Sequence, residues 1–169
     1  MSGIQIGGTE VNQDISAKAE TPDQQCGVVV VSFDDTGAKP IQAGLAKCVI
    51  RKRVPKTTAA EWLYVYVNSP VCAIVARAAI SKVDSVSLRA ALNLSKDLCL
   101  SPDAITQYFE GADSVGIYRL KHIEIASKPP TLEWLRDQMI FHPPQSFLFL
   151  SVTAKKIIDS AASFKKTKK

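Results

Sequence analysis

The segment Trp62-Leu63-Tyr64-Val65-Tyr66-Val67-Asn68-Ser69-Pro70, with the apolar run 71–80 that follows it, determines how this chain folds. Aromatic and β-branched residues favour strands, because their side chains pack well on a half-buried pleated surface. Asn68-Ser69-Pro70 is typical of a turn and interrupts both apolar runs. The segment therefore predicts two antiparallel strands joined as a hairpin.

A second apolar run, Val28-Val29-Val30-Val31, predicts a buried strand near the start of the folded chain at Gly27. Ser101-Pro102-Asp103 predicts the start of a helix that ends at Gly111, and Thr131 is a second candidate N-cap. The other predicted elements are a turn at 34–37, a helix at 39–45, a strand at 48–55, helices at 86–94 and 132–139, and strands at 114–125 and 146–152. About six strands with three or four short inserted helices favour an α+β fold built on a small β-barrel.

Length and charge predict one folded domain with two tails. A chain of 169 residues suggests a single domain, which we place at 27–152. Residues 1–26 hold four acidic residues and one lysine, so we expect a flexible acidic tail, whereas 153–169 hold six lysines and one aspartate and predict a basic tail that frays. No apolar run approaches the ~20 residues that span a bilayer, and no signal peptide is evident, so we expect a cytoplasmic protein without a membrane partner.

A basic cluster gives the first indication of a ligand. Lys47, Arg51, Lys52, Arg53 and Lys56 fall close together with no acidic residue among them. Such a cluster attracts polyanions, of which nucleic acid is the commonest in a cell, although charges of this kind also guard the edge strand of a sheet. Because Arg51 and Arg53 alternate along the predicted strand, both are expected to point to one face.

Tyr64 and Tyr66 also alternate and allow two interpretations, a platform on which unpaired bases stack or a half-buried core. The four cysteines form no CxxC pair, and His122 and His142 are the only histidines, so we expect no metal and no cofactor.

Three segments in order resemble a known family. They are the run from Tyr64 to Val71, then Tyr108-Phe109-Glu110-Gly111 at a helix end, then Pro143-Pro144-Gln145-Ser146-Phe147 at the last strand. Together they resemble the ASCH branch of the PUA-like superfamily, small β-barrels associated with RNA and nucleotide handling. The resemblance implies a PUA-like β-barrel with a central cleft, whose candidate residues here are Gly44, Ser69, Gln145 and Ser146.

The signature of that family, G-x-K-x-x-E-x-R, is only half present. Aligned without gaps on residues 44–51, it matches at Gly44 and Arg51 but meets Ala46 at the lysine position and Val49 at the glutamate position. In amidohydrolase members of the family the cleft lysine and an acid contribute to catalysis. Acid–base work requires a titratable group in the cleft, so this departure favours binding over catalysis.

The sequence leaves three hypotheses of function. The first is a nucleic-acid-binding module that prefers RNA to DNA and acts as a regulator of transcription or translation, with contacts from Lys47, Arg51, Lys52, Arg53 and Lys56. The second is an enzyme of the amidohydrolase or ribonuclease type, for which Lys47, Tyr108 and His142 are the candidate catalytic residues. The third is a protein-interaction module that docks partners through its acidic and basic tails.

Overall fold

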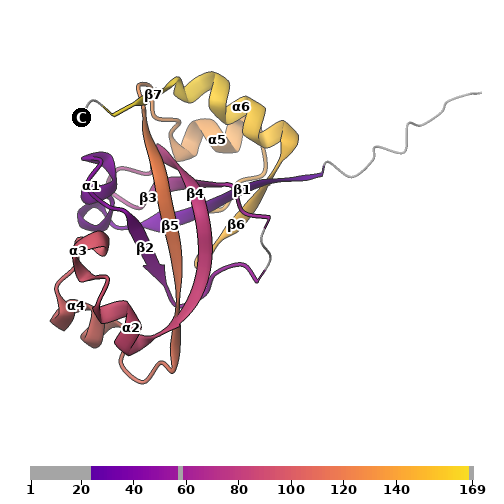
Figure 1. The fold of residues 1–169 in the computed structure, drawn as a ribbon. Helices are drawn as coiled ribbons and strands as arrows, with labels where there is room; N and C mark the ends of the chain where they lie inside the picture. Colours follow the sequence, from indigo (N-terminus) through magenta and orange to yellow (C-terminus); the bar gives the residue numbers. More distant parts are fainter. Residues whose placement is uncertain (1–23, 57–58, 168–169) are drawn as a thin grey trace, which may run out of the picture.

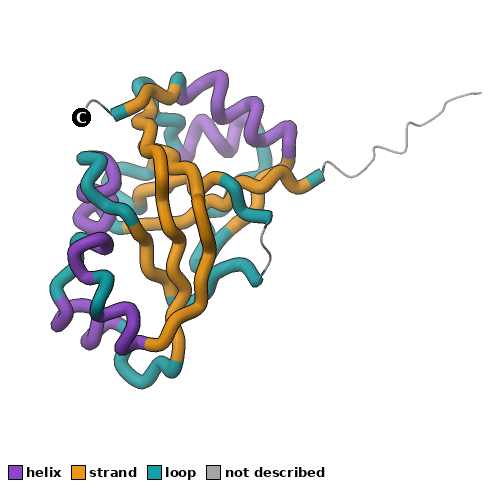
Figure 2. Tube along the Cα trace, viewed as in Figure 1, coloured by secondary structure: helices purple, strands orange, loops and turns teal. Residues whose placement is uncertain are grey.

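A computed structural model describes residues 24–56 and 59–167, which form seven strands and six helices in one sheet-centred unit (Figures 1 and 2). The strands are β1 (Gln25–Phe33), β2 (Cys48–Arg51), β3 (Trp62–Val67), β4 (Ala73–Ser87), β5 (Ser114–Ala126), β6 (Leu148–Ser151) and β7 (Phe164–Lys166). The helices are α1 (Asp35–Gln42), α2 (Leu88–Leu92), α3 (Ser95–Leu98), α4 (Pro102–Tyr108), α5 (Leu132–Gln138) and α6 (Val152–Ala162).

The seven strands form one open sheet in the order β2-β5-β4-β3-β1-β6, with β7 paired to β5 beside this path. The α+β class is confirmed, but the prediction of a closed barrel is wrong. The outer strands β2 and β6 have four residues each and pair only with β5 and β1 within the described chain. Without a hydrogen-bonded contact between these two short edges, the sheet cannot close.

The parallel pair β1–β3 lies inside the sheet, between β4 and β6, and separates two hydrophobic cores. Val29 and Val31 of β1 pack with Ile41 of α1 on one face. Val28 and Val30 point to the other face, where residues from α5 and α6 cover them. Helices therefore lie on both faces, which explains why β1 and β3 read as continuous apolar runs.

Tyr64 and Tyr66 belong to the second core, with exposed fractions of 0% and 1%. Tyr66 packs against the ring of Phe141 at a centroid distance of 5.8 Å. Of the two interpretations open at the sequence level, the stacking platform is wrong, because α5, α6 and the following chain cover this face of the sheet.

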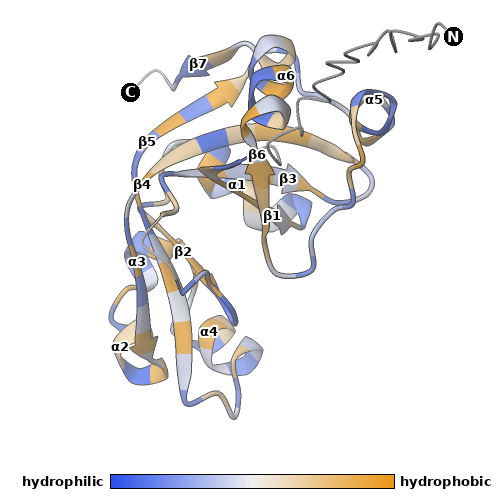
Figure 3. Ribbon diagram, turned by 90° about the vertical axis from the view of Figure 1, so that its right-hand side faces the viewer, coloured by the Kyte–Doolittle hydropathy of each residue, from blue (hydrophilic) through white to orange (hydrophobic). Residues whose placement is uncertain are grey.

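A third core lies where β4 ends and β5 begins. There α2, α3 and α4 form a separate helical layer (Figure 3). Ile105 and Phe109 pack there against β2 and β5. Ser101 caps α4 as predicted, since its Oγ accepts a hydrogen bond from the amide of Ala104, and Thr131 caps α5 in the same way. The strand β4 extends to Ser87, which caps α2, so the helix predicted from 86 begins later, at Leu88.

Helix α1 begins four residues before the predicted position. The Oδ1 atom of Asp34 accepts a hydrogen bond of 2.6 Å from the amide of Gly37. The residues Asp35-Thr36-Gly37, which were expected to form a turn, are therefore the first turn of a capped helix.

The C-terminal segment is folded as far as Thr167, which contradicts the expectation that the chain frays beyond 152. Helix α6 buries Ile158 and Ala162, and β7 pairs with residues 124–126 of β5. The guanidinium of Arg77 lies 4.5 Å from the ring centroid of Phe164 and joins this segment to the sheet. Of the predicted acidic tail, 1–23 lie outside the described residues, and Gln25 and Cys26 belong to β1.

Strand β2 ends at Arg51 instead of continuing to Pro55. Gly116 of β5 pairs with Arg51, and the side chain of Val54 packs directly over Gly116. A Cβ atom on Gly116 would lie only 2.2 Å from Cγ1 of Val54. The chain therefore leaves the sheet after Arg51 to place Val54 on this glycine.

This contact predicts a coupled stability effect. We expect Gly116→Ala to lower the free energy of unfolding by about 2 kcal/mol, because an added methyl group overpacks the site. Val54→Ala in the same chain removes the two closest contacts of the added methyl group, those with Cγ1 and Cγ2, so the double variant should lose less stability than the sum of the two single losses. Urea unfolding of the four proteins measures the coupling, and simple additivity would contradict the contact.

Candidate functional site

A cavity of about 820 Å³ lies between α1, β2 and the segment 98–109 that includes α4. Its walls are mainly apolar and include Ile41, Ile50 and Ile105. Polar or charged side chains are few at this cavity: Ser32, Asp34, Thr36, Asn68, Arg51, Tyr108 and Gln145, together with the thiols of Cys48 and Cys99. This composition, apolar walls with a few polar groups, is typical of a small-molecule site.

The parallel pairing of β1 and β3 creates one edge of the cavity. Phe33 pairs with Val67, so both strands end side by side. The amide of Asn68 donates a 2.8 Å hydrogen bond to the carbonyl oxygen of Phe33, which holds Asn68 beside Asp34. Both side chains therefore border the cavity, although they are far apart in sequence.

Arg51 is the cation that borders the cavity. Its Nη1 donates to the carbonyl oxygen of Ile50 at 2.8 Å, and its Nη2 donates to the carbonyl oxygen of Ser32 at 2.9 Å. The guanidinium carbon lies 4.1 Å from the ring centroid of Phe33, a cation–π contact. Burial lowers the pKa of the Arg51 guanidinium, because desolvation disfavours the charged form.

Arg51 differs from the other partly buried arginines, Arg77 and Arg119. Arg77 pairs with Glu124 at 2.5 Å and with Asp159 at 3.3 Å, and Arg119 pairs with Asp84 at 2.7 Å. Desolvation acts to lower the pKa of Arg77, but hydrogen bonds with Tyr64 and Glu124 outweigh it and raise that pKa. Among the described residues, no carboxylate forms an ion pair with Arg51.

Ala46 and Val49 are buried and line the cavity. In the gapless alignment of residues 44–51 with the signature of the ASCH family, they stand at the lysine and glutamate positions, and both line the cavity. The groups needed for proton transfer at these positions are replaced by a methyl and an isopropyl group. Arg51 is left as a fixed cation there, because arginine stays protonated.

Of the four predicted cleft residues, Gln145 borders the cavity, whereas Gly44, Ser69 and Ser146 are not among the described residues that line it. Gly44 instead ends α1 with a positive φ of 71°, the left-handed conformation that favours glycine.

The three candidate catalytic residues are not brought together. Tyr108 borders the cavity with 66% of its side chain exposed. The ammonium of Lys47 lies 4.0 Å from Asp97 and is largely exposed, and neither Lys47 nor His142 is among the described residues that line the cavity. No described group of three or more His, Cys, Asp and Glu side chains is placed to hold a metal ion.

The basic cluster does not lie along one strand face. Lys52, Arg53 and Lys56 are exposed and follow the end of β2, so the expected alternation of Arg51 and Arg53 on one strand is wrong. The ammonium of Lys52 lies 5.3 Å from the ring centroid of Tyr108, which places this lysine at the mouth of the cavity.

Sequence reasoning missed Phe33, Asp34 and Asn68. Asp34 and Asn68 each follow a run that was correctly predicted as a strand. The available signal was their position, because polar residues at the ends of parallel neighbouring strands meet at one edge. The parallel pairing itself could not be read from either run.

Substitution by methionine should have different effects on the free energy of unfolding at Arg51 and at Arg77. We expect Arg51→Met to leave the free energy of unfolding unchanged or higher, because it removes a desolvated cation that has no carboxylate partner. Arg77→Met should lower it by about 3 kcal/mol, because Glu124 and Asp159 lose their common partner. Urea unfolding at pH 7 measures both variants, and an equal loss of stability in the two would contradict the assignment.

Comparison with known proteins extends the description. No protein-family model and no curated protein matches the sequence. A solved ASCH protein of Zymomonas mobilis superimposes with a TM-score of 0.75 at 21% identity, covering 84% of this chain and 99% of that protein. A serine-to-alanine variant of the same protein gives 0.75 at 20% identity, covering 83% and 99%.

The N-terminal domain of Staphylothermus marinus McrB gives a TM-score of 0.58 at 15% identity, covering 81% of this chain and 95% of that domain.

Among the described residues, no helix combines the length and the apolar character needed to cross a bilayer. The open sheet, its flanking helices and the agreement over nearly the full length of the Zymomonas protein together show that this chain has the PUA-like fold of the ASCH domain proteins.

Proposed function

We propose that this protein binds single-stranded nucleic acid, RNA in preference to DNA, and holds one end or one unpaired base of the strand in the cavity beside Arg51. The observation that carries the proposal is a desolvated arginine that borders a cavity without a carboxylate partner among the described residues. Such a cation is stabilised when a ligand brings an anion or hydrogen-bond acceptors to it.

The size and the lining of the cavity support a nucleotide as its occupant. Its volume of about 820 Å³ lies within the range of ligand pockets. Tyr108, which is 66% exposed, offers an aromatic face, and Asn68 and Gln145 offer amide groups that donate and accept hydrogen bonds. Unpaired bases are recognised in proteins by this combination of stacking and edge contacts.

The rim supports a strand that continues out of the cavity. Lys52, Arg53 and Lys56 are exposed in the chain that follows β2, and Lys52 lies over Tyr108 at the mouth. Cations in this position attract phosphates without regard to base sequence. Both the resemblance of the sequence to ASCH proteins and the fold agree with nucleic-acid handling.

The proposal assigns binding and no catalytic step. Ala46 and Val49 put apolar groups on the cavity wall, and neither can carry a proton at the pH of a cell. The cavity therefore favours a ligand that is held unchanged. A role in the regulation of transcription or translation belongs to the same proposal, because an RNA held in this way is masked from other proteins.

Fluorescence anisotropy with labelled hexauridylate tests the proposal. We expect Arg51→Met to weaken binding by roughly 30-fold, since a charge-assisted contact to RNA is worth about 2 kcal/mol. Lys52→Ala/Arg53→Ala should weaken binding and reduce the slope of log affinity against log salt by about two.

Arg136→Met is the matched control, because Arg136 is exposed on α5 at the opposite face of the sheet from α1. Its affinity should equal that of the unsubstituted protein. If Arg51→Met binds hexauridylate as tightly as this control, the cavity is not the RNA site. Hexadeoxythymidylate run in parallel reports the preference between RNA and DNA.

A further inference from the structure

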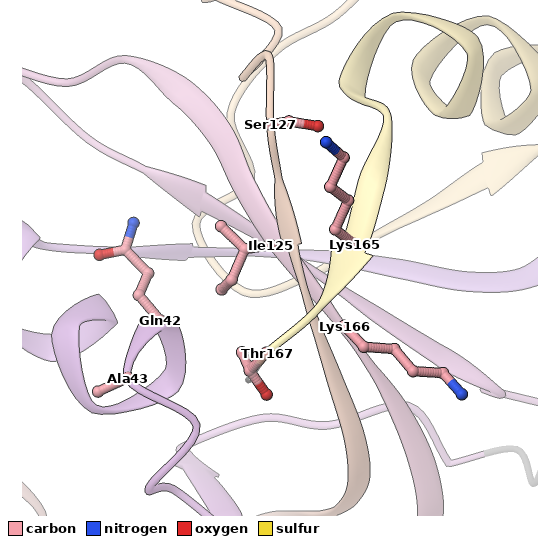
Figure 4. A pocket seen from close by; sticks show the side chains of 7 residues that line it. All are labelled: Gln42, Ala43, Ile125, Ser127, Lys165, Lys166 and Thr167. Carbon is pink, nitrogen blue, oxygen red and sulfur yellow. The ribbon is translucent and has the colours of Figure 1, made fainter. Parts of the chain in front are cut away.

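A second, smaller groove lies at the other end of α1. It has a volume of about 340 Å³ and is formed by the end of α1, the end of β5 and strand β7. Figure 4 shows Gln42 on one side, Lys165 and Thr167 on the other, and the side chain of Ile125 between them. Lys166 also borders the groove but extends from the opposite side of β7.

Helix α1 connects this groove with the larger cavity. Thr36 and Pro40 border the cavity, and Ala43 borders the groove. Residues at spacings of four and three lie on the same face of a helix. Ile41 borders the cavity and the next residue, Gln42, borders the groove, so the two sites adjoin along α1.

The groove has the chemistry of an anion site. Its charged lining residues are both cations, Lys165 and Lys166, and the Gln42 amide adds a neutral donor. The carbonyls at the end of α1 do not oppose an anion strongly, because backbone amides satisfy them: Gly44 donates to Ile41, and Leu45 donates to Pro40. Ile125 provides an apolar wall on which a ribose can rest.

We infer that this groove binds a backbone phosphate of the same RNA strand whose end lies in the cavity, so that α1 spans two subsites of one site. The inference rests on the proposed function. UpU carries a single backbone phosphate, so it has no further phosphate for the groove once that phosphate lies beside Arg51. The protein should therefore prefer longer strands, such as hexauridylate, to the dinucleotide UpU.

Lys165 and Lys166 could instead protect the edge of the sheet, and the experiment has to distinguish this role from phosphate binding. Strand β7 has three residues and lies at an edge, and lysines on edge strands prevent pairing with another chain. Edge protection predicts no dependence of affinity on ligand length. A phosphate subsite predicts that the lysines matter for long strands and not for short ones.

Two variants test the inference through binding of labelled hexauridylate and of the dinucleotide UpU. We expect Lys165→Ala/Lys166→Ala to weaken hexauridylate binding about tenfold at low salt and to lower the salt slope by up to about two, with UpU binding unchanged. Gln42→Glu, which leaves β7 intact and puts a negative charge in the groove, should weaken hexauridylate binding in the same selective way. Thermal unfolding verifies that each variant is folded.

Arg136→Ala/Lys156→Ala is the matched control, since it removes two exposed cations from α5 and α6 on the opposite face of the sheet. The inference is overturned if the groove variants bind hexauridylate like the unsubstituted protein, if UpU weakens equally, or if the control has the same effect. Failure of the proposed function gives a different result: Arg51→Met then leaves both ligands unaffected, or neither ligand binds at all.

Discussion

The parallel pairing of β1 with β3, with Val28 opposite Trp62 and Phe33 opposite Val67, is the constraint on which the remaining structure depends. It buries the centre of the sheet on both faces, so each strand needs helices above and below it. It also makes both strands end at one edge. Asp34 and Asn68 meet there, and α1 starts from the same point. The register of β1 against β3 therefore determines both the two hydrophobic cores on either face of the sheet and one edge of the cavity.

Arg51 and Arg77 show how one residue type serves two purposes in this fold. Arg77 lies between the rings of Trp62 and Phe164, and two carboxylates neutralise it, so its charge is satisfied inside the protein. Arg51 has a ring and two carbonyl oxygens but no ion pair among the described residues. A folded chain keeps such a group at a cost in stability, and this one lies beside a cavity.

Local features were predictable from the sequence because they depend on neighbouring residues. The strand Trp62–Val67 and the caps at Ser101 and Thr131 appear as expected, since propensity and capping act within a few positions. Closure of the sheet was not predictable, because it depends on whether two distant edges meet. The site was half predictable: Arg51, Tyr108 and Gln145 carried motif signals, whereas Phe33 and Asn68 reach the cavity only through parallel pairing.

The attachment of α6 and β7 to the sheet has a consequence for synthesis of the chain on the ribosome. Arg77 is made early, but Asp159 and the ring of Phe164, which partly surround it, are made more than 80 residues later. Until then Tyr64 lacks Asp159, its acceptor, and the second core lacks Ile158. Before these residues are made, the chain therefore holds an unfinished polar cluster on one face of its sheet, and α6 and β7 can close that face only in a late step.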